Sequence, residues 1–177
     1  MNRAIVDIET SGFSITKNAV VEIGIVVINK NYEVINSHSK IIKPYTRPDS
    51  IELVSYKEDA MAVHGITMNE INNGFDVIEV LEHLKSVLVK YEVTTLIGHN
   101  IKSFDLPRLD YLFKRFTEHE LNYIILDTLE EAKKIGLRLE SYSLGSLCEH
   151  YGIINNDSHR ALGDCFATLE LLKKFGI

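Results

Sequence analysis

Residues 19–29 read AVVEIGIVVIN, a nearly continuous run of β-branched and apolar side chains that is typical of a β-strand. A shorter apolar segment precedes it at residues 3–9, and residues 33–44 alternate more loosely after it. The connections between these segments are short. The first part of the chain therefore predicts three antiparallel strands in a meander.

The rest of the chain alternates between helical and strand patterns. Apolar residues recur at helical spacing in residues 75–90 and 103–116, and helices are also expected at 142–151 and 159–175. Strands are expected at 94–98 (TTLIG) and 123–126, whereas residues 45–73 are less regular. These patterns predict one α/β domain over residues 1–177. Its mixed five-stranded sheet would hold three antiparallel strands and then parallel strands, flanked by helices.

Composition excludes several classes of protein. No apolar run approaches the roughly 18 residues that span a membrane, so we expect no membrane association. Two cysteines are too few for a disulfide framework, which favours a cytoplasmic location. The net charge of −6 argues against a protein that coats nucleic acid with a broad basic face. It does not exclude an enzyme that grips the end of one strand.

Asp7 and Glu9 stand two positions apart in the first expected strand. Because side chains alternate along a strand, both carboxylates project from one face, and Val6 and Ile8 project from the other. Two neighbouring carboxylates repel each other unless a cation lies between them. A strand that ends in a solvated turn could carry the same residues, so the pair indicates a metal site only in combination with other acids.

Two further acids and one histidine stand out later in the chain. Asp105 follows the strand at 94–98 and lies in the first turn of a helix, where it could also serve as a plain capping residue. Asp164 lies among small and apolar residues about one turn into the last helix. His159 precedes it by five positions, which places the two about 140° apart on an ideal helix. They converge only if His159 lies in the preceding loop.

These segments together resemble the DEDD exonucleases, in the subgroup that has a catalytic histidine. The family's three motifs resemble VDIETSGF, with Asp7 and Glu9, LIGHNIKSFDLPRL, with Asp105, and HRALGDCFAT, with His159 and Asp164. The five-residue gap in the third motif is typical of the histidine subgroup. The resemblance is closest in style to the proofreading epsilon subunit of bacterial replicative polymerases, and it covers about residues 3–174.

The resemblance implies a ribonuclease-H-like fold and a metal-dependent 3′→5′ exonuclease that releases nucleoside 5′-monophosphates. Asp7, Glu9, Asp105 and Asp164 would hold two Mg²⁺ or Mn²⁺ ions, since hard cations prefer oxygen ligands. His159 would act as the general base, because histidine has an unperturbed pKa of about 6.5.

The resemblance also implies a set of substrate contacts, each with a structural alternative. Backbone groups around Ile8, Thr10 and Phe13 would line the pocket of the terminal nucleotide, with Phe13 against the base. Phe13 could instead pack on the sheet edge. His64 could approach the same pocket or stabilise a turn, and Asn100 could bind substrate or order its loop.

The expected partner is a nucleic acid 3′ end, with DNA favoured over RNA. A DNA polymerase subunit is a further partner if the chain is part of a larger assembly; the alternative is a free-standing exonuclease. Lys102 lies where a phosphate could pass, although exposed lysines are common. Two rival hypotheses stay open, namely an RNA-directed exonuclease and a non-catalytic binding module with the same fold.

Overall fold

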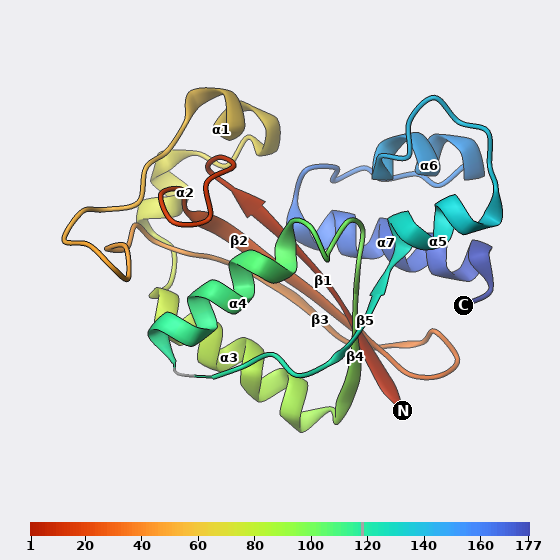
Figure 1. Ribbon diagram of the computed structural model, residues 1–177, viewed down its shortest axis with the longest axis horizontal. Coiled ribbons are helices and arrows are strands. Elements are labelled where there is room, and N and C mark those ends of the chain that lie inside the picture. The colour runs from red at the N-terminus through yellow and green to blue at the C-terminus, as the bar shows by residue number, and fades with distance from the viewer. Residues whose placement is uncertain (118) are drawn as a thin grey trace.

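The computed structural model describes residues 1–117 and 119–177, and its centre is a five-stranded sheet in the order β3-β2-β1-β4-β5 (Figure 1). β1 pairs antiparallel with β2, and β2 pairs antiparallel with β3. β4 runs parallel to β1, and β5 runs parallel to β4. The predicted mixed sheet is therefore confirmed. The strands are β1 (Asn2–Thr10), β2 (Val20–Ile28), β3 (Val34–Ile41), β4 (Val93–Gly98) and β5 (Ile124–Asp127).

Helices cover both faces of this sheet. One face packs against α3 and α4 through a large apolar cluster, and the other packs against α7 through a smaller one. The helices are α1 (Glu58–His64), α2 (Met68–Asn72), α3 (Val77–Lys90), α4 (Asp105–Phe116), α5 (Thr128–Ile135), α6 (Leu144–Tyr151) and α7 (Ala161–Phe175). Within the described residues, none of them is long and apolar enough to cross a membrane.

β2 is buried at all nine of its positions, because helices cover both of its faces. This explains the unbroken apolar run that the sequence shows there. At Gly24 the N-terminus of α7 comes so close that an added Cβ would lie 2.5 Å from the carbonyl carbon of Ala161. A glycine is required at this point, since any side chain would push α7 away from the sheet.

The last helix begins two residues later than the expected boundary at His159. α7 starts at Ala161, and His159 adopts a φ of 61° in the turn before it. A non-glycine residue rarely adopts this left-handed conformation, and it cannot continue into a helix. His159 is thus placed in the loop, which is the arrangement that allows it to approach Asp164.

Candidate active site

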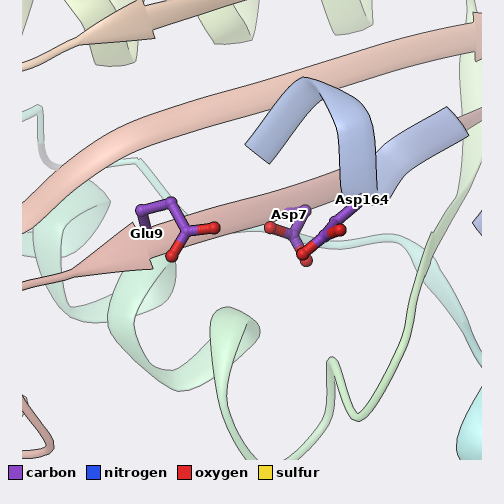
Figure 2. A group of neighbouring side chains, drawn as sticks. All are labelled: Asp7, Glu9 and Asp164. Atoms are coloured by element: carbon purple, nitrogen blue, oxygen red, sulfur yellow. The ribbon is translucent and has the colours of Figure 1, made fainter. Parts of the chain in front are cut away.

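Three carboxylates meet where the C-terminal half of β1 faces the first turn of α7. Asp7 and Glu9 project from β1 toward α7, whereas Val6 and Ile8 are buried on the opposite face. Asp164 reaches them from α7 (Figure 2). One oxygen from each of the three lies within 4.8 Å of an oxygen of both others. The predicted convergence of these three acids is therefore present in the fold.

Asp105 lies beside this group but outside the 4.8 Å cluster. Its side chain is buried in the first turn of α4, with 2% of its surface exposed, and its Oδ1 accepts a hydrogen bond of 3.1 Å from the amide of Ile8. It lines the same cavity as the other three acids. The amide of Ile8, which we expected near the substrate, is thus already paired with Asp105.

The four carboxylates have raised pKa values. Burial raises the pKa of Asp7 well above its usual range, and the charges of Asp105 and Asp164 add to the effect. Burial and nearby acids raise the pKa of Glu9 to about 8, and burial raises that of Asp105 to about 7. The pKa of Asp164 is also raised by burial.

This cluster of desolvated, mutually repelling oxygens fits a cation. The negative charges destabilise one another in the absence of a counter-charge, and a bound cation would remove that cost. Carboxylate oxygens are the ligands that hard divalent cations prefer. Oxygens from two different elements, a strand and a helix, also supply the several ligands that such an ion requires.

His159 lies at the rim of the same cavity. Its side chain is exposed, and it lines the cavity together with Asp164, Asp7 and Glu9. A hydrogen bond from its own backbone also reaches the carboxylate of Asp164. The turn before α7 thus brings His159 and Asp164 to the same cavity, although five positions separate them in the sequence.

Asn155 is a site residue that the sequence analysis missed. Its Nδ2 donates a hydrogen bond of 2.6 Å to Oδ1 of Asp164. The loop between α6 and α7 brings the two together. This loop packs closely on α7, because an added Cβ at Gly163 would lie 2.2 Å from the carbonyl oxygen of Asp157. No pattern in the sequence marks Asn155, since it lies in a loop next to a second asparagine, Asn156.

Glu22 lies on the same sheet face, directly opposite Glu9 in the β1–β2 register. It accepts hydrogen bonds from Nε and Nη2 of Arg160 at 3.0 and 3.1 Å, from the amide of Ala161 at 3.1 Å and from Oγ of Ser39 at 2.8 Å. Its oxygens are occupied by these donors. Glu22 therefore fastens the start of α7 to the sheet and is separate from the cluster of Asp7, Glu9 and Asp164.

Three cavities adjoin the acids. One of about 540 Å³ borders Asp164 and His159 along α6, and the other two border Glu9. The larger of these two, of about 560 Å³, extends from Glu9 and Phe104 past the carboxylates to Lys133 and Tyr142. A smaller and more apolar one, of about 150 Å³, adjoins it at Ile8, Glu9 and Phe104. Its other lining residues come from the β1–β2 connection and α1, and they are Thr10, Gly12, Phe13, Ala60, Val63 and His64.

Phe13 and His64 both face the smaller cavity. Phe13 is 78% exposed, so it does not pack on the sheet edge. His64 is buried, and its Nδ1 accepts a hydrogen bond from the amide of Ile66. Its Nε2 is therefore the protonated nitrogen of the neutral ring, and it has no hydrogen-bond partner among the described residues. His64 thus stabilises a turn and still holds a free donor.

Asn100 and Lys102 lie in the loop that follows β4. Asp127 accepts hydrogen bonds from the backbone amides of both residues, which orders the loop. The side chain of Asn100 lines the larger cavity. Lys102 instead forms an ion pair with Glu130 at 2.6 Å and lines neither the larger nor the smaller cavity.

Comparison with known proteins places this geometry in context. A family model described as exonuclease (RNase_T) matches residues 4–172. The 3′-5′ exonuclease DinG of Staphylococcus saprophyticus is 28% identical over 172 residues, which make up 96% of this chain and 17% of DinG. A PolC-type DNA polymerase III of Thermotoga maritima is 30% identical over 180 residues, 98% of this chain and 12% of the polymerase.

The fold also matches solved structures. The structure of E. coli exonuclease I in complex with a dT13 oligonucleotide superimposes with a TM-score of 0.78, at 19% identity, over 98% of this chain and 40% of that one. At this identity the likeness shows the fold alone, which is the predicted ribonuclease-H-like fold. The sequence motifs, the fold and the match of the family model agree. The chain belongs to the exonuclease family, in the DEDD group that carries a histidine.

Proposed function

We propose that this chain hydrolyses phosphodiester bonds from the 3′ end of DNA in a metal-dependent reaction and releases nucleoside 5′-monophosphates. One observation carries the proposal. Asp7, Glu9 and Asp164 converge beside the exposed His159 in a single cavity. The convergence supports this function over a non-catalytic module, because a binding module has no need for an uncompensated acidic cluster.

The cofactors in this proposal are two Mg²⁺ or Mn²⁺ ions, held by Asp7, Glu9, Asp105 and Asp164. Such ions, when bound, supply charge stabilisation at the scissile phosphate and lower the pKa of a water molecule. The raised pKa values of the four carboxylates support this assignment, since a cation offsets the repulsion that raises them.

His159 takes the proton of the attacking water in the proposed reaction. The water oxygen forms a bond to phosphorus, and the bond from phosphorus to the 3′ oxygen of the preceding nucleotide breaks. The leaving 3′ oxygen then receives a proton from solvent, which balances the step. The exposed position of His159 at the cavity rim supports this role, because a general base must exchange its proton with solvent in each turnover.

The smaller cavity is the proposed site of the terminal nucleotide. Phe13 offers an exposed aromatic face for stacking on any base, and His64 lines the same space. Thr10 and the backbone around Ile8 line the same space, and Asn100 faces the adjoining cavity. A pocket of about 150 Å³ beside the carboxylates supports a requirement for a strand end.

DNA is the proposed substrate, because the relatives include DNA polymerases and the superimposed exonuclease I holds a dT13 oligonucleotide. Association with a DNA polymerase is a further proposal, supported by the PolC-type relative. The two rivals differ from this proposal in substrate or in activity, so a single assay separates them.

The decisive assay compares end-labelled single-stranded DNA, duplex DNA, RNA and circular single-stranded DNA, with and without Mg²⁺ or Mn²⁺. A 5′ label should give a descending ladder, and a 3′ label should appear at once as mononucleotide. Circular DNA should survive. Frayed ends should react faster than blunt ends, since unpairing a base costs a few kcal/mol. Cleavage of circles, or mononucleotide released first from the 5′ label, would contradict the proposal. Faster hydrolysis of RNA would favour the RNA-directed rival.

A further inference from the structure

The positions of the larger and the smaller cavity define a path for the nucleic acid strand. The smaller cavity lies by the β1–β2 connection and α1, and the far wall of the larger cavity is formed by α5 and the start of α6. In Figure 1 these two regions lie on opposite sides of the C-terminal end of β1. The carboxylates lie between them. A strand with its last nucleotide in the smaller cavity has room for its preceding nucleotide in the larger cavity, along α5 and the start of α6.

Lys133 occupies this far wall. It is the only lysine or arginine among the residues that line the larger cavity, as far as the described chain shows. Its side chain is exposed, and it makes no ion pair or side-chain hydrogen bond with any described residue. Two nearby lysines differ in this respect, because Lys102 pairs with Glu130 and Lys134 pairs with Glu131, each at 2.6 Å.

The helix that carries Lys133 is held firmly in place. Asp127 caps α5 by accepting a hydrogen bond from the amide of Leu129. Ala132, the residue before Lys133, is fully buried in a cluster with Leu147 and Leu171. Ala132 therefore fixes the helix against α6 and α7. Lys133 thus stands at a defined place on the wall of an otherwise acidic cavity.

From these observations we infer that Lys133 binds the phosphate of the second phosphodiester from the 3′ end. This inference rests on the proposed function, because it needs a strand whose scissile phosphate lies at the carboxylates. A phosphate diester is the group that a single exposed ammonium recognises, and the contact is independent of base sequence. The contact holds the strand on the 5′ side of the scissile bond. It also offsets the negative charge of the cavity for an approaching polyanion.

Two substrates separate this contact from the reaction itself. One is a short single-stranded DNA, and the other is the p-nitrophenyl ester of thymidine 5′-monophosphate. The ester carries a terminal nucleotide and a scissile phosphodiester, but it has no second nucleotide phosphate. The variant is Lys133→Met, which keeps the length of the side chain and removes its charge. The matched control is Lys134→Met, on the next residue, whose lysine already has a carboxylate partner.

We expect Lys133→Met to lower kcat/KM on the DNA by about tenfold, mainly through KM. The slope of log affinity against log salt concentration should become less steep by about 1. Hydrolysis of the ester should change by less than about twofold, because the ester has no second nucleotide phosphate for Lys133 to bind. The tenfold loss on the DNA corresponds to a lost charge contact of about 1.4 kcal/mol. Lys134→Met should behave like the wild type on both substrates.

Three results would overturn the inference. An unchanged kcat/KM on DNA would show that Lys133 makes no contact with the strand. An equal loss on both substrates would place its effect at the scissile phosphate or in the fold. An equal loss in Lys134→Met would reduce it to the general charge of the surface. If the wild type hydrolyses neither substrate in the presence of metal, the proposed function itself fails, and the inference fails with it.

Discussion

Glu9 on β1 and Glu22 on β2 are direct neighbours on one face of the sheet, yet their surroundings are opposite. Burial alone would raise the pKa of Glu22, but hydrogen bonds from Arg160, Ser39 and Ala161 outweigh it and hold that pKa below its usual value. Glu9 has the charges of Asp164, Glu22 and Asp105 around it, and burial together with these charges raises its pKa to about 8.

The difference shows how one turn of the chain serves two purposes. His159 lines the acidic cavity, whereas the next residue, Arg160, binds Glu22. The side chain of Arg160 and the amide of Ala161 donate their hydrogen bonds to Glu22, and these bonds fasten α7 to the sheet. No side chain in the described part of the chain donates a hydrogen bond to the carboxylates of Asp7 and Glu9, so these acids remain available to cations. A fully paired acid stabilises the fold, and an unpaired acid next to it supplies chemistry.

The largest expected effect comes from removing one unpaired carboxylate. Asp7→Asn or Asp164→Asn should lower exonuclease activity at least 100-fold, because transition-state charge stabilisation is worth several kcal/mol. The metal-free protein should keep its fold and its melting temperature, since repulsion between acids is relieved. Release of mononucleotide and thermal unfolding measure the two effects. Activity above about a tenth of the wild type in either variant would contradict a shared metal site.

The next largest effect is expected from the loss of the His159 side chain. His159→Ala should lower kcat by about 10²–10⁴-fold, as is typical for loss of a general base. Its melting temperature and its affinity for a strand end should stay close to those of the wild type, because the side chain is exposed. Single-turnover kinetics and an equilibrium binding assay with Ca²⁺ in place of Mg²⁺ give these values. A rate like that of the wild type would assign His159 to a solvated loop.

Asn155 tests an intermediate case, a site carboxylate that has one side-chain donor. Asn155→Ala should weaken the binding of Mn²⁺ by about 10–100-fold, because a lost hydrogen-bond partner lets a metal ligand reorient. Titration calorimetry of the protein alone measures this without any turnover. Asn156→Ala is the control, since its side chain is exposed and makes no hydrogen bond to a described residue. Equal affinities for Mn²⁺ in the two variants would show that Asp164 needs no such partner.

Substitutions of Glu22 and Glu9 compare how much each acid contributes to the free energy of unfolding. Glu22→Gln should lower the free energy of unfolding of the metal-free protein by about 1–3 kcal/mol, because Arg160 loses its charged partner. Glu9→Gln, at the position opposite, should leave it unchanged or raise it. Chemical denaturation in the absence of metal gives both values. A similar loss in both variants would show that the two acids do not differ in the way that their hydrogen bonds indicate.

Much of the fold could be predicted from the sequence. The strand at residues 19–29 was evident because both of its faces are covered, and the helix at 75–90 was evident because only one of its faces is. The expected starts of four helices, at residues 75, 103, 142 and 159, each lie two residues before the observed ones. The positive φ of His159 follows from the packing of the loop on α7, and a sequence pattern carries no record of such packing.

The candidate site was predicted only in part. Asp7, Glu9 and Asp164 converge as expected, since strand alternation and helix position fix their directions. Asn155 was missed, because its contact with Asp164 depends on the path of an irregular loop. Lys102 illustrates the opposite case. It stands near the motif in sequence but pairs with Glu130, while Lys133, distant in sequence, lines the cavity. The roles of these residues stay predictions until they are measured.

The smallest expected effect is the response of the metal-free protein to pH. The pKa of Glu9 is raised to about 8 and that of Asp105 to about 7, so the folded chain holds protons that the unfolded chain has released. Wherever the folded state binds more protons, stability falls as pH rises. This loss begins above the ordinary carboxyl pKa and is complete once pH passes the raised values.

Other groups restrict the useful window of pH. The pKa values of four histidines are lowered, mainly by burial, so these residues add stability as pH rises, but only up to about 6.5. Burial raises the pKa of Cys148 and Cys165, and this matters only above about pH 8.5. The Glu22 hydrogen bonds lose their contribution only at acidic pH, because the pKa of that residue is lowered. Between about pH 7 and pH 8 the site carboxylates therefore dominate.

In this window the melting temperature of the metal-free wild type should fall, by about 2–4 °C for each kcal/mol lost. Glu9→Gln should show a smaller fall, because the group that titrates near pH 8 is gone. Added Mg²⁺ should raise the melting temperature of the wild type more at pH 8 than at pH 7, since cations must displace fewer protons there. Thermal unfolding at the two pH values, with and without Mg²⁺, measures all three effects. Suppose that the melting temperature is equal at both pH values in the metal-free wild type and also in Glu9→Gln. The pKa values of these carboxylates would then not be raised by burial and repulsion, and the contrast with Glu22 would be wrong.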